Sequence, residues 1–537
     1  MKKSKKLYVV LSAIILTMVL AACGGAGGAA DTVAPPPAQG QQAQPPAAPT
    51  DTDADTGTDG GVVRFAAHWV ISTSGYTPEL TANSALPFVT LAHQSLLTFA
   101  ADGSFAPLLA TSWDVDADEP SITWNLRQGV LFSDGTPFNA AAVQRNIEEY
   151  QSFGRSEVAN VSGFEIIDEH TIKMLLHQWD SSMLESIGFF VYYMSPTALE
   201  DIESLRTSSA GTGPFRVVDF QPGVLTVFER NEHYWEDGLP IVDRVEMHVV
   251  AEPTTRAAAF QAGEFDIVVI NNLAVAQQLI DADEFILLEN VSGAGLVGVG
   301  LIPNSRIEGI PFADPRVRQA MCYAIDEHAI ANIAGFGLLQ VTNQWAAPGA
   351  ATFNPNVRGF PFNPDRAREL LTEAGFPDGF ETNIYTTTGH QVTVTAAAHM
   401  LQEVGIRANI IQIDEAAQTA FMANGEWDGI MMHFHAISPN LGLYMGRHLD
   451  GAFYVNGLLI PDEVMDMLQA IRTAPTEAER LRLEHEMQLL VYDELALFGQ
   501  PIFVQREPVF TQPHLMDSNY GYYHLFTWTP AKMWINR

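Results

Sequence analysis

Two histidines follow an apolar run in the last third of the chain. Residues 429–432 are Gly-Ile-Met-Met and predict a buried strand, after which His433 and His435 stand on either side of one aromatic residue. On a strand, a His-x-His pair directs both imidazole rings to one face. Imidazole suits nickel, copper and zinc, and it equally suits a hydrogen-bonding or stacking wall for an organic ligand. The spacing leaves both interpretations open.

Large aromatic side chains form the second group of candidate ligand-binding residues. Trp and Tyr combine a wide apolar area with a polar tip, so they suit flat or amphipathic ligands. The alternative for each of them is core packing, because most large aromatic side chains are largely buried. The candidates are Trp69, Tyr76, Trp345, Trp427 and Tyr444.

Familiar catalytic signatures are missing from the sequence. No G-x-S-x-G, H-E-x-x-H, C-x-x-C or P-loop pattern occurs. These absences argue against the common hydrolases, metalloproteases, redox enzymes and nucleotide-dependent enzymes. We therefore expect a protein that is not an enzyme and that needs no cofactor.

The elements that must position these residues are clearest between residues 211 and 270. Alternating apolar runs around Val217 and Val227 predict two paired strands, joined by a turn at residues 221–223. The pattern then predicts a strand, a helix and a buried strand, at residues 244–250, 254–263 and 265–270. This alternation of strands and helices favours an α/β or mixed α+β architecture.

Several sequence blocks occur in a fixed order along nearly all of the chain beyond residue 62. They are PLLATSW (107–113) with WNLRQGVLFSDGTPFNAAAV (124–143), the stretch from GTGPF to GEFD (211–266), DPRVRQAMCYAIDEHAI (314–330) and NPDRARELLTEAG (363–375). In sequence and order they resemble family 5 of bacterial extracellular solute-binding proteins. The resemblance implies a protein that captures a solute and delivers it to an ABC importer.

The resemblance implies a two-lobed fold, periplasmic-binding-protein-like of type II, cluster C, with mixed α/β composition and an extra subdomain in the first lobe. The expected ranges are 62–293 for lobe I, with the subdomain at about 105–208, then 294–499 for lobe II and 500–537 for the return to lobe I. So long a body exceeds the size at which one core keeps growing, which agrees with two lobes. Apolar runs at residues 296–302 and 500–505 are candidate crossings between the lobes, or else core strands.

The resemblance also implies a ligand site between the lobes, where concave sites preferentially occur. It places the loop after the first strand, residues 62–66, at this cleft. That loop carries His68, Trp69 and Tyr76. These side chains are therefore expected to contact the solute.

The solute class is open on the same grounds. In peptide-binding relatives, an aspartate near the position of Pro439 binds the ammonium group of the peptide, whereas Ser438 and Asn440 flank this proline here. In nickel-binding relatives, a histidine near the same strand end touches a metal chelate, a role that His433 or His435 could fill. We expect a peptide or peptide-like organic solute, with a nickel or other metal chelate as the alternative, and a surface receptor as a further one.

The first residues predict export and lipidation. Lysines at positions 2, 3, 5 and 6 precede an apolar run at residues 7–20, the pattern of a signal peptide. Residues 20–23 are Leu-Ala-Ala-Cys and resemble the bacterial lipobox, so Cys23 is the expected lipidation site after removal of residues 1–22. Residues 23–61 lack large apolar side chains and are expected to form a disordered tether. The body would thus be anchored to the outer face of the cell membrane, on the periplasmic side in a Gram-negative host.

The charge balance limits the partners. The chain has 28 basic and 63 acidic residues, a formal net charge of −35, so the basic footprint of a nucleic-acid-binding protein is absent. The acidity either favours cationic solutes or reflects a general surface property. The expected partners are the solute, the ABC permease and its ATPase subunits, and the membrane through the lipid anchor. The protein itself is expected to be a monomer.

Overall fold

The structure is a computed structural model, and it describes residues 60–80, 85–100, 104–288, 297–346, 348, 352–387, 389–436, 456–505, 507–518, 520 and 530–536. Cys23, the expected signal peptide and the tether lie outside the described residues. Tyr444 does as well.

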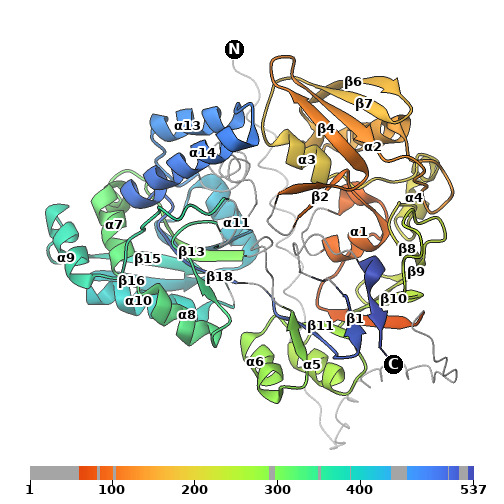
Figure 1. Cartoon of the computed structure of the whole chain (residues 1–537). Coiled ribbons are helices and arrows are strands. Elements are labelled where there is room, and N and C mark those ends of the chain that lie inside the picture. Colours follow the sequence, from red (N-terminus) through yellow and green to blue (C-terminus); the bar gives the residue numbers. More distant parts are fainter. Residues whose placement is uncertain are drawn as a thin grey trace, which may run out of the picture. The chain divides into compact units, whose positions relative to one another are not determined.

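A seven-stranded mixed sheet forms the first lobe (Figure 1). In spatial order its strands are β12 (Ile286–Leu288), β19 (Val509–Thr511), β11 (Ile267–Val269), β1 (Val62–Ala67), β10 (Arg244–Val249), β9 (Leu225–Arg230) and β8 (Phe215–Gln221). The inner strand β1 runs parallel to both of its neighbours, β10 and β11. β8 and β9 pair antiparallel, with Gln221 opposite Leu225. The turn and strands that the alternating pattern predicted in this region are confirmed.

Helices cover the first-lobe sheet and extend it. The helix predicted from residue 254 is present as α5 and begins one residue earlier, because Pro253 occupies the first helical turn, where its missing N–H is not needed. Including α5 (Pro253–Gln261), the helices and 3₁₀ turns described up to residue 282 are η1 (Thr77–Glu79), α1 (Leu86–Ala92), α2 (Ala140–Phe153), η3 (Ser156–Val158), α3 (Met183–Phe189), η4 (Ala198–Glu200), α4 (Ile202–Leu205) and α6 (Leu273–Ala282).

A separate antiparallel sheet lies within the range expected for the inserted subdomain. Its spatial order is β4 (Ala110–Asp116), β5 (Ser121–Leu126), β7 (Thr171–Leu176) and β6 (Val161–Asp168). The hairpin β2 (Leu97–Phe99) with β3 (Phe105–Pro107) precedes it. One core cluster contains Trp124 of β5, Ile147 of α2 and Ile187 of α3, so this sheet and these helices form one packed layer pair.

A six-stranded mixed sheet forms the second lobe. Its spatial order is β14 (Gln340–Val341), β18 (Gln500–Gln505), β13 (Val297–Pro303), β17 (Gly429–Ala436), β15 (Phe380–Thr386) and β16 (Ile406–Gln412). The two apolar runs considered as crossings are therefore strands, β13 and β18, that pair with each other inside this sheet. The chain passes from the second sheet to the first between β18 and β19.

The helices of the second lobe follow the sequence blocks. Residues 314–330 form two helices, because the side chain of Asp326 accepts a hydrogen bond from the Ala329 amide and thereby caps a new helix. The helical elements are η5 (Pro311–Ala313), α7 (Pro315–Tyr323), α8 (Glu327–Gly335), α9 (Pro364–Glu373), α10 (Gln391–Glu403), α11 (Glu415–Asn424), α13 (Asp462–Arg472), α14 (Glu477–Gln488) and the π-helical turn η6 (Leu489–Glu494).

The chain ends beside the first-lobe sheet. Leu515 and Tyr520 belong to the same core cluster as Phe65 of β1. The remaining short elements are β20 (Leu515–Met516), η7 (Pro530–Lys532) and β21 (Trp534–Ile535). The polypeptide thus contributes its first described strand and its last segments to one lobe.

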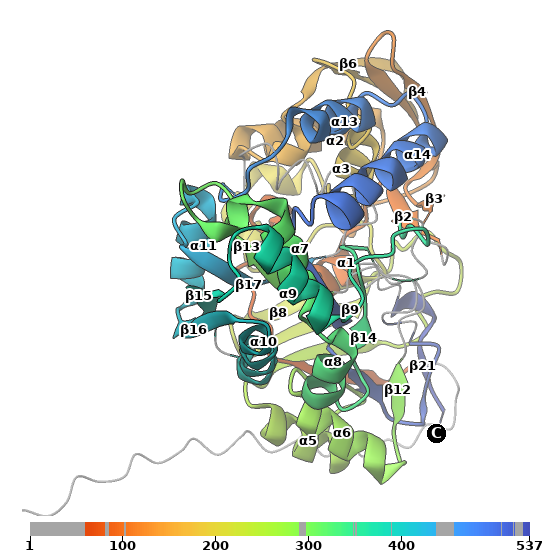
Figure 2. The ribbon, with the colours of Figure 1, turned by 90° about the vertical axis from the view of Figure 1, so that its left-hand side faces the viewer.

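Residues of the subdomain in the first lobe donate hydrogen bonds to backbone carbonyls of the second lobe. The indole Nε1 of Trp179 donates to the carbonyl of Ala474 at 2.9 Å. Ser181 donates from its amide to the carbonyl of Arg472 at 2.7 Å and from its hydroxyl to the carbonyl of Ile471 at 2.9 Å. The carbonyls of Ile471 and Arg472 at the end of α13, and that of Ala474 just beyond it, therefore accept hydrogen bonds from the segment before α3. Figure 2 shows α13 and α14 next to α3.

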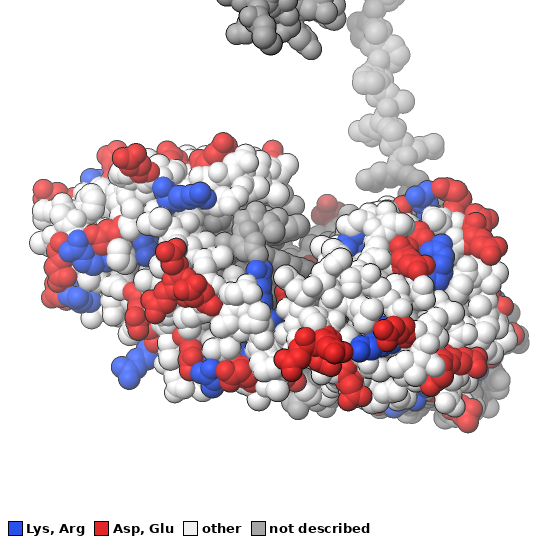
Figure 3. All heavy atoms as spheres, turned by 90° about the horizontal axis from the view of Figure 1, so that it is seen from above, with Lys and Arg blue, Asp and Glu red and all other residues white. Residues whose placement is uncertain are grey.

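Acidic side chains are dispersed over the surface. On the face drawn in Figure 3, carboxylate residues lie over both lobes, interspersed with fewer basic ones. On this face the acidity follows from the composition as a whole and is not concentrated at one place.

Candidate functional site

Polar and aromatic side chains meet at the carboxyl end of the inner parallel strand β1. His68 and Trp69 follow β1 directly, and the neighbouring strands β10 and β11 end at the same edge. Ligands of open α/β sheets bind at such carboxyl edges. Glu507 reaches the same place from the passage between β18 and β19. We call His68, Trp69 and Glu507 the passage cluster.

Direct contacts hold the passage cluster together. The Nε1 of Trp69 donates to Oε2 of Glu507 at 3.1 Å, and Nε2 of His68 lies 3.3 Å from Oε1 of the same carboxylate. The side chain of His68 is 27% exposed and that of Glu507 is 35% exposed, whereas Trp69 is buried. The carboxylate of Glu507 and the imidazole of His68 are therefore accessible to a solute. The buried indole of Trp69 holds the carboxylate in place through its hydrogen bond.

The surroundings shift both titratable groups toward their neutral forms. Burial, and then the positive charge of Arg256, lower the pKa of His68 to about 4. Burial raises the pKa of Glu507 to about 7, although the hydrogen bond from Trp69 and the charge of Arg256 act in the opposite direction. Desolvation penalises the charged form of each group. Near neutral pH, His68 is neutral and Glu507 is partly ionised.

Arg256 of α5 holds the strand ends around the cluster. Its guanidinium is fully buried, and it donates to the carbonyl of Val250 after β10 and, at 2.6 Å, to that of Val269 in β11. Further donation goes to the carbonyl of Ala251 at 3.1 Å and to Oδ1 of Asn271 at 2.7 Å. Both guanidinium Nη groups and Nε are thus occupied by the protein, and Arg256 acts on the cluster through its charge.

Aromatic rings support the cluster from the core. The rings of His68 and Trp69 are 5.8 Å apart between centroids, and those of Trp69 and Phe65 are 6.2 Å apart. Tyr520 packs on Phe65 at 5.3 Å. Rings at these separations make favourable edge and tilted contacts, which restrict the orientation of the loop after β1.

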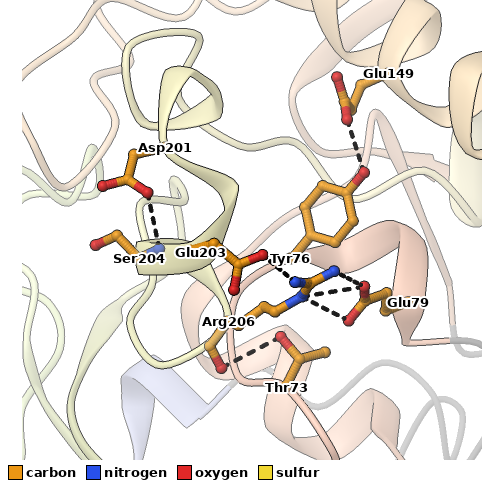
Figure 4. Close-up of polar contacts among 8 residues, drawn as sticks. All are labelled: Thr73, Tyr76, Glu79, Glu149, Asp201, Glu203, Ser204 and Arg206. Atoms are coloured by element: carbon orange, nitrogen blue, oxygen red, sulfur yellow. Dashed lines mark hydrogen bonds and ion pairs between the residues drawn. The ribbon is translucent and has the colours of Figure 1, made fainter.

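Tyr76 lies in a different cluster (Figure 4). Its hydroxyl donates to Oε1 of Glu149 in α2 at 2.7 Å, and the residue is 3% exposed. Its ring meets that of Phe153 edge-on at 5.9 Å. Nearby, Arg206 pairs with Glu79 at 2.6 Å. These contacts fasten the loop after β1 to the subdomain, so Tyr76 anchors this loop, and its contact with a solute stays a prediction.

Trp345 and Trp427 come together in one core cluster of the second lobe. They are 1% and 0% exposed. A Cβ placed at Gly300 would lie 2.5 Å from the ring of Trp345, and one at Gly457 would lie 2.3 Å from the ring of Trp427. Both indoles are therefore packed directly against backbone. A contact of either ring with a solute stays a prediction.

His433 lies on β17, opposite Gly300 of β13, and it is 8% exposed. His435 lies on the same strand opposite Gly298. In the described part of the chain, no group of three or more His, Cys, Asp or Glu side chains is arranged to hold a metal ion. Solute contact by either histidine stays a prediction, as does that of Tyr444.

Sequence reasoning missed Glu507 and Arg256. Glu507 is a single carboxylate between two apolar strands, residues 500–505 and 509–511, and a charge in such a place is a usable signal. Its partner Trp69 is 438 positions away, and no local pattern reveals that pairing.

None of the described helices is long and apolar enough to span a bilayer.

Two lobes with separate sheets, and accessible polar groups at the carboxyl edge of one sheet, define the class of two-lobed solute-binding proteins. Comparison with known proteins specifies the family. The model described as "Bacterial extracellular solute-binding proteins, family 5 Middle" matches residues 104–452, which is more than half of the chain. The protein belongs to this family, and the resemblance found in its sequence blocks is confirmed.

Individual relatives agree with this assignment. The chain is 28% identical over 428 residues to the glutathione-binding protein GsiB of Shigella flexneri, an alignment that covers 75% of this chain and 81% of that protein. The structure is similar to DppA from Helicobacter pylori in complex with the peptide STSA, with 21% identity, a TM-score of 0.69, and coverage of 89% and 99%. It is also similar to NikA from Brucella suis in complex with Fe(III)-EDTA, with 19% identity, a TM-score of 0.76, and coverage of 88% and 100%. The expected two-lobed fold is confirmed.

Proposed function

We propose that the protein is the substrate-binding component of an ABC importer. It captures a peptide or peptide-like organic solute between its lobes outside the cell and delivers it to the permease and the ATPase subunits. The observation that carries this proposal is the passage cluster, a partly exposed carboxylate and imidazole over an indole, at the carboxyl edge of β1 and beside the passage between the lobes. Such a site can bind a polar solute, and a binding role agrees with the solute-binding family to which the chain belongs.

The names of the relatives support a peptide-like solute. GsiB is called a glutathione-binding protein and aligns with three quarters of the chain, and glutathione is itself a short peptide. Hydrogen-bonding groups and an aromatic floor fit the amide and polar ends of such a molecule.

The proposal is tested by mass spectrometry of the protein without residues 1–23, first under native conditions and then after denaturation. We expect a stoichiometric organic mass that is released on denaturation, and a rise in melting temperature when it is added back. A preparation that carries no solute, and that is not stabilised by any di- or tripeptide or by glutathione, would contradict the proposal. The variant Trp69→Phe keeps the ring but loses the hydrogen bond to Glu507, and it should bind the solute more weakly.

A metal chelate is the second candidate, and the position of His433 favours it. This imidazole lies on β17 in the second lobe and is 8% exposed, and imidazole suits nickel and copper. Elemental analysis of the same preparation tests this candidate. One equivalent of nickel, copper, zinc or iron that is lost in His433→Ala would establish it, whereas a metal-free preparation with an organic solute would dismiss it.

We also propose that Cys23 carries the lipid and that residues 23–61 link it to a monomeric body. Acyl chains bind a membrane because each buried methylene contributes about 0.8 kcal/mol. For the body, the proposed ranges are 62–293 with the subdomain at 105–208, then 294–499, then 500–537. Proteolysis of the purified protein should cut first within 23–61, and gel filtration should give a monomer.

A further inference from the structure

We infer that Glu507 is a specificity-determining residue that binds a primary ammonium group of the solute. This inference rests on the proposed function and names the chemistry that its site selects. It follows from the position, the free acceptor capacity and the charge environment of one carboxylate.

The position of Glu507 makes it available to a solute. The backbone next to it is fixed to the first lobe, because the Ile270 amide donates to the carbonyl of Pro508 at 2.8 Å. Its side chain is 35% exposed, and it lies where β1, β10 and β11 end. The carboxylate therefore stands at the edge where an α/β sheet binds ligands, and it belongs to the segment that leads from one lobe to the other.

The carboxylate retains acceptor capacity. A carboxylate has about four acceptor positions. Trp69 occupies one position on Oε2 of Glu507, and His68 occupies one on Oε1. Among the described residues, no lysine or arginine lies within 4.0 Å of the Glu507 carboxylate. The His68 imidazole does lie within that distance, but it is neutral near pH 7 because burial lowers its pKa to about 4. An ammonium group provides the donors that this carboxylate still lacks, and it places a positive charge in direct contact with the carboxylate.

The hydrogen-bonding groups that the cluster exposes favour a solute cation over a solute anion. Arg256 is fully buried, and four of its five N–H donors are engaged by backbone carbonyls and by Asn271, so its guanidinium is not exposed to a solute carboxylate. A solute carboxylate would instead meet Glu507 itself, which repels it.

The solute chemistry is tested with matched probes. Calorimetric titration compares trialanine with N-acetyl-trialanine and glutathione with N-acetyl-glutathione, and 1,4-diaminobutane represents an ammonium group without a peptide. We expect the amine-bearing member of at least one pair, or the diamine, to bind wild-type protein, and Glu507→Gln to weaken that binding about 10- to 100-fold, as loss of a charged hydrogen-bond partner does. Preference for trialanine or glutathione over the diamine would identify the source as a peptide, and the reverse would identify a polyamine.

A matched variant controls for general effects of charge. Glu381→Gln removes one carboxylate from β15, where the side chain is 78% exposed, and it should bind the probes like wild type. If Glu507→Gln is poorly folded, His68→Gln serves as the second variant, because it perturbs the same carboxylate and keeps a polar side chain. The inference would be overturned if each amine and its N-acetyl counterpart bound equally well, or if Glu507→Gln and His68→Gln both bound the probes with wild-type affinity.

Proton release gives an independent readout. His68, Trp69, Arg256 and Tyr520 are the described groups that face or act on Glu507. Burial raises the pKa of Glu507 to about 7, so a bound ammonium group should displace a proton from it at pH 6.5. At pH 8.5 the carboxylate has almost no proton to release, and a peptide amine, with an ordinary pKa of about 7.7–8.0, should instead take up a proton on binding. Titrations in two buffers of different ionisation enthalpy measure this release, and it should vanish in Glu507→Gln. Binding without proton release at pH 6.5 would overturn the inference.

Failure of the inference and failure of the proposed function are distinguishable. If the solute that co-purifies has no amine, the protein still binds a solute and only the inference is wrong. If no solute co-purifies and no probe binds, both are wrong. A co-purified amine that binds Glu507→Gln as tightly as wild type also contradicts the inference alone.

Discussion

The three hydrogen bonds between the subdomain and α13 should hold the lobes together, and their removal should favour opening. Trp179→Phe deletes the bond to the carbonyl of Ala474 and keeps the ring, and Ser181→Ala deletes the hydroxyl bond to Ile471. The amide of Ser181, which donates to Arg472, remains in both variants. Each lost bond contributes about 1 kcal/mol. The double variant should therefore shift the equilibrium toward opening by about 2 kcal/mol, or about 30-fold.

Amide hydrogen exchange at Ser181 measures this shift directly. The amide is protected only while it donates to the carbonyl of Arg472 at 2.7 Å, so its exchange rate follows the opening equilibrium. We expect exchange at this position to be about 30-fold faster in the double variant. Amides inside β13, which pairs with β17 and β18, should exchange as in wild type.

Thr473→Ala is the matched control. Its hydroxyl donates to the carbonyl of Gln469 within α13, so the variant removes a bond from the same helix end without touching the other lobe. Exchange at Ser181 should remain unchanged in this control. An unchanged rate at Ser181 in the double variant would refute the reasoning, because the two side-chain bonds would then not restrain opening.

Other predictions concern the anchor, the titration of Glu507 and the core of the second lobe. Cys23→Ser should move the protein from the membrane fraction to the soluble fraction, and continued dependence on detergent would contradict lipidation. Burial raises the pKa of Glu507 from 4.5 to about 7, so the native state binds this proton more tightly than the unfolded chain between those values. The free energy of unfolding of wild type should therefore fall relative to that of Glu507→Gln as the pH rises from 4.5 to 7, and a constant difference in urea unfolding would refute this. Trp427→Ala should lower the free energy of unfolding by about 3–5 kcal/mol because the ring is fully buried. A loss near 0.5 kcal/mol, typical of surface sites, would contradict that.

Local patterns predicted the elements well, and they predicted long-range packing poorly. The strands β8 and β9 and the turn between them follow from alternating apolar residues and a glycine. The same rules cannot tell whether Trp345 or Trp427 lines a cleft or fills a core, because a large aromatic side chain is suited to either position. Burial against Gly300 and Gly457 is set by the packing of distant segments.

The candidate site shows the same division. His68 and Trp69 were recognisable as polar and aromatic residues after a strand, and the structure keeps them together. Their common partner, Glu507, comes from a strand pairing that brings β19 next to β11. A carboxylate in an apolar passage could have been noticed, but the residue it faces depends on the topology of the whole lobe.

The two sets of contacts suggest an order of events in solute capture. Glu507 is tied to the first lobe through Pro508 and Ile270, so the passage cluster stays assembled when the lobes separate and can bind the solute before closure. The bonds of Trp179 and Ser181 to α13 join different lobes and can form only after closure. Loss of the bonds from Trp179 and Ser181 should therefore raise the dissociation rate of the co-purified solute and leave its association rate unchanged. Stopped-flow fluorescence would measure both rates. An association rate that falls with an unchanged dissociation rate would mean that these contacts precede binding.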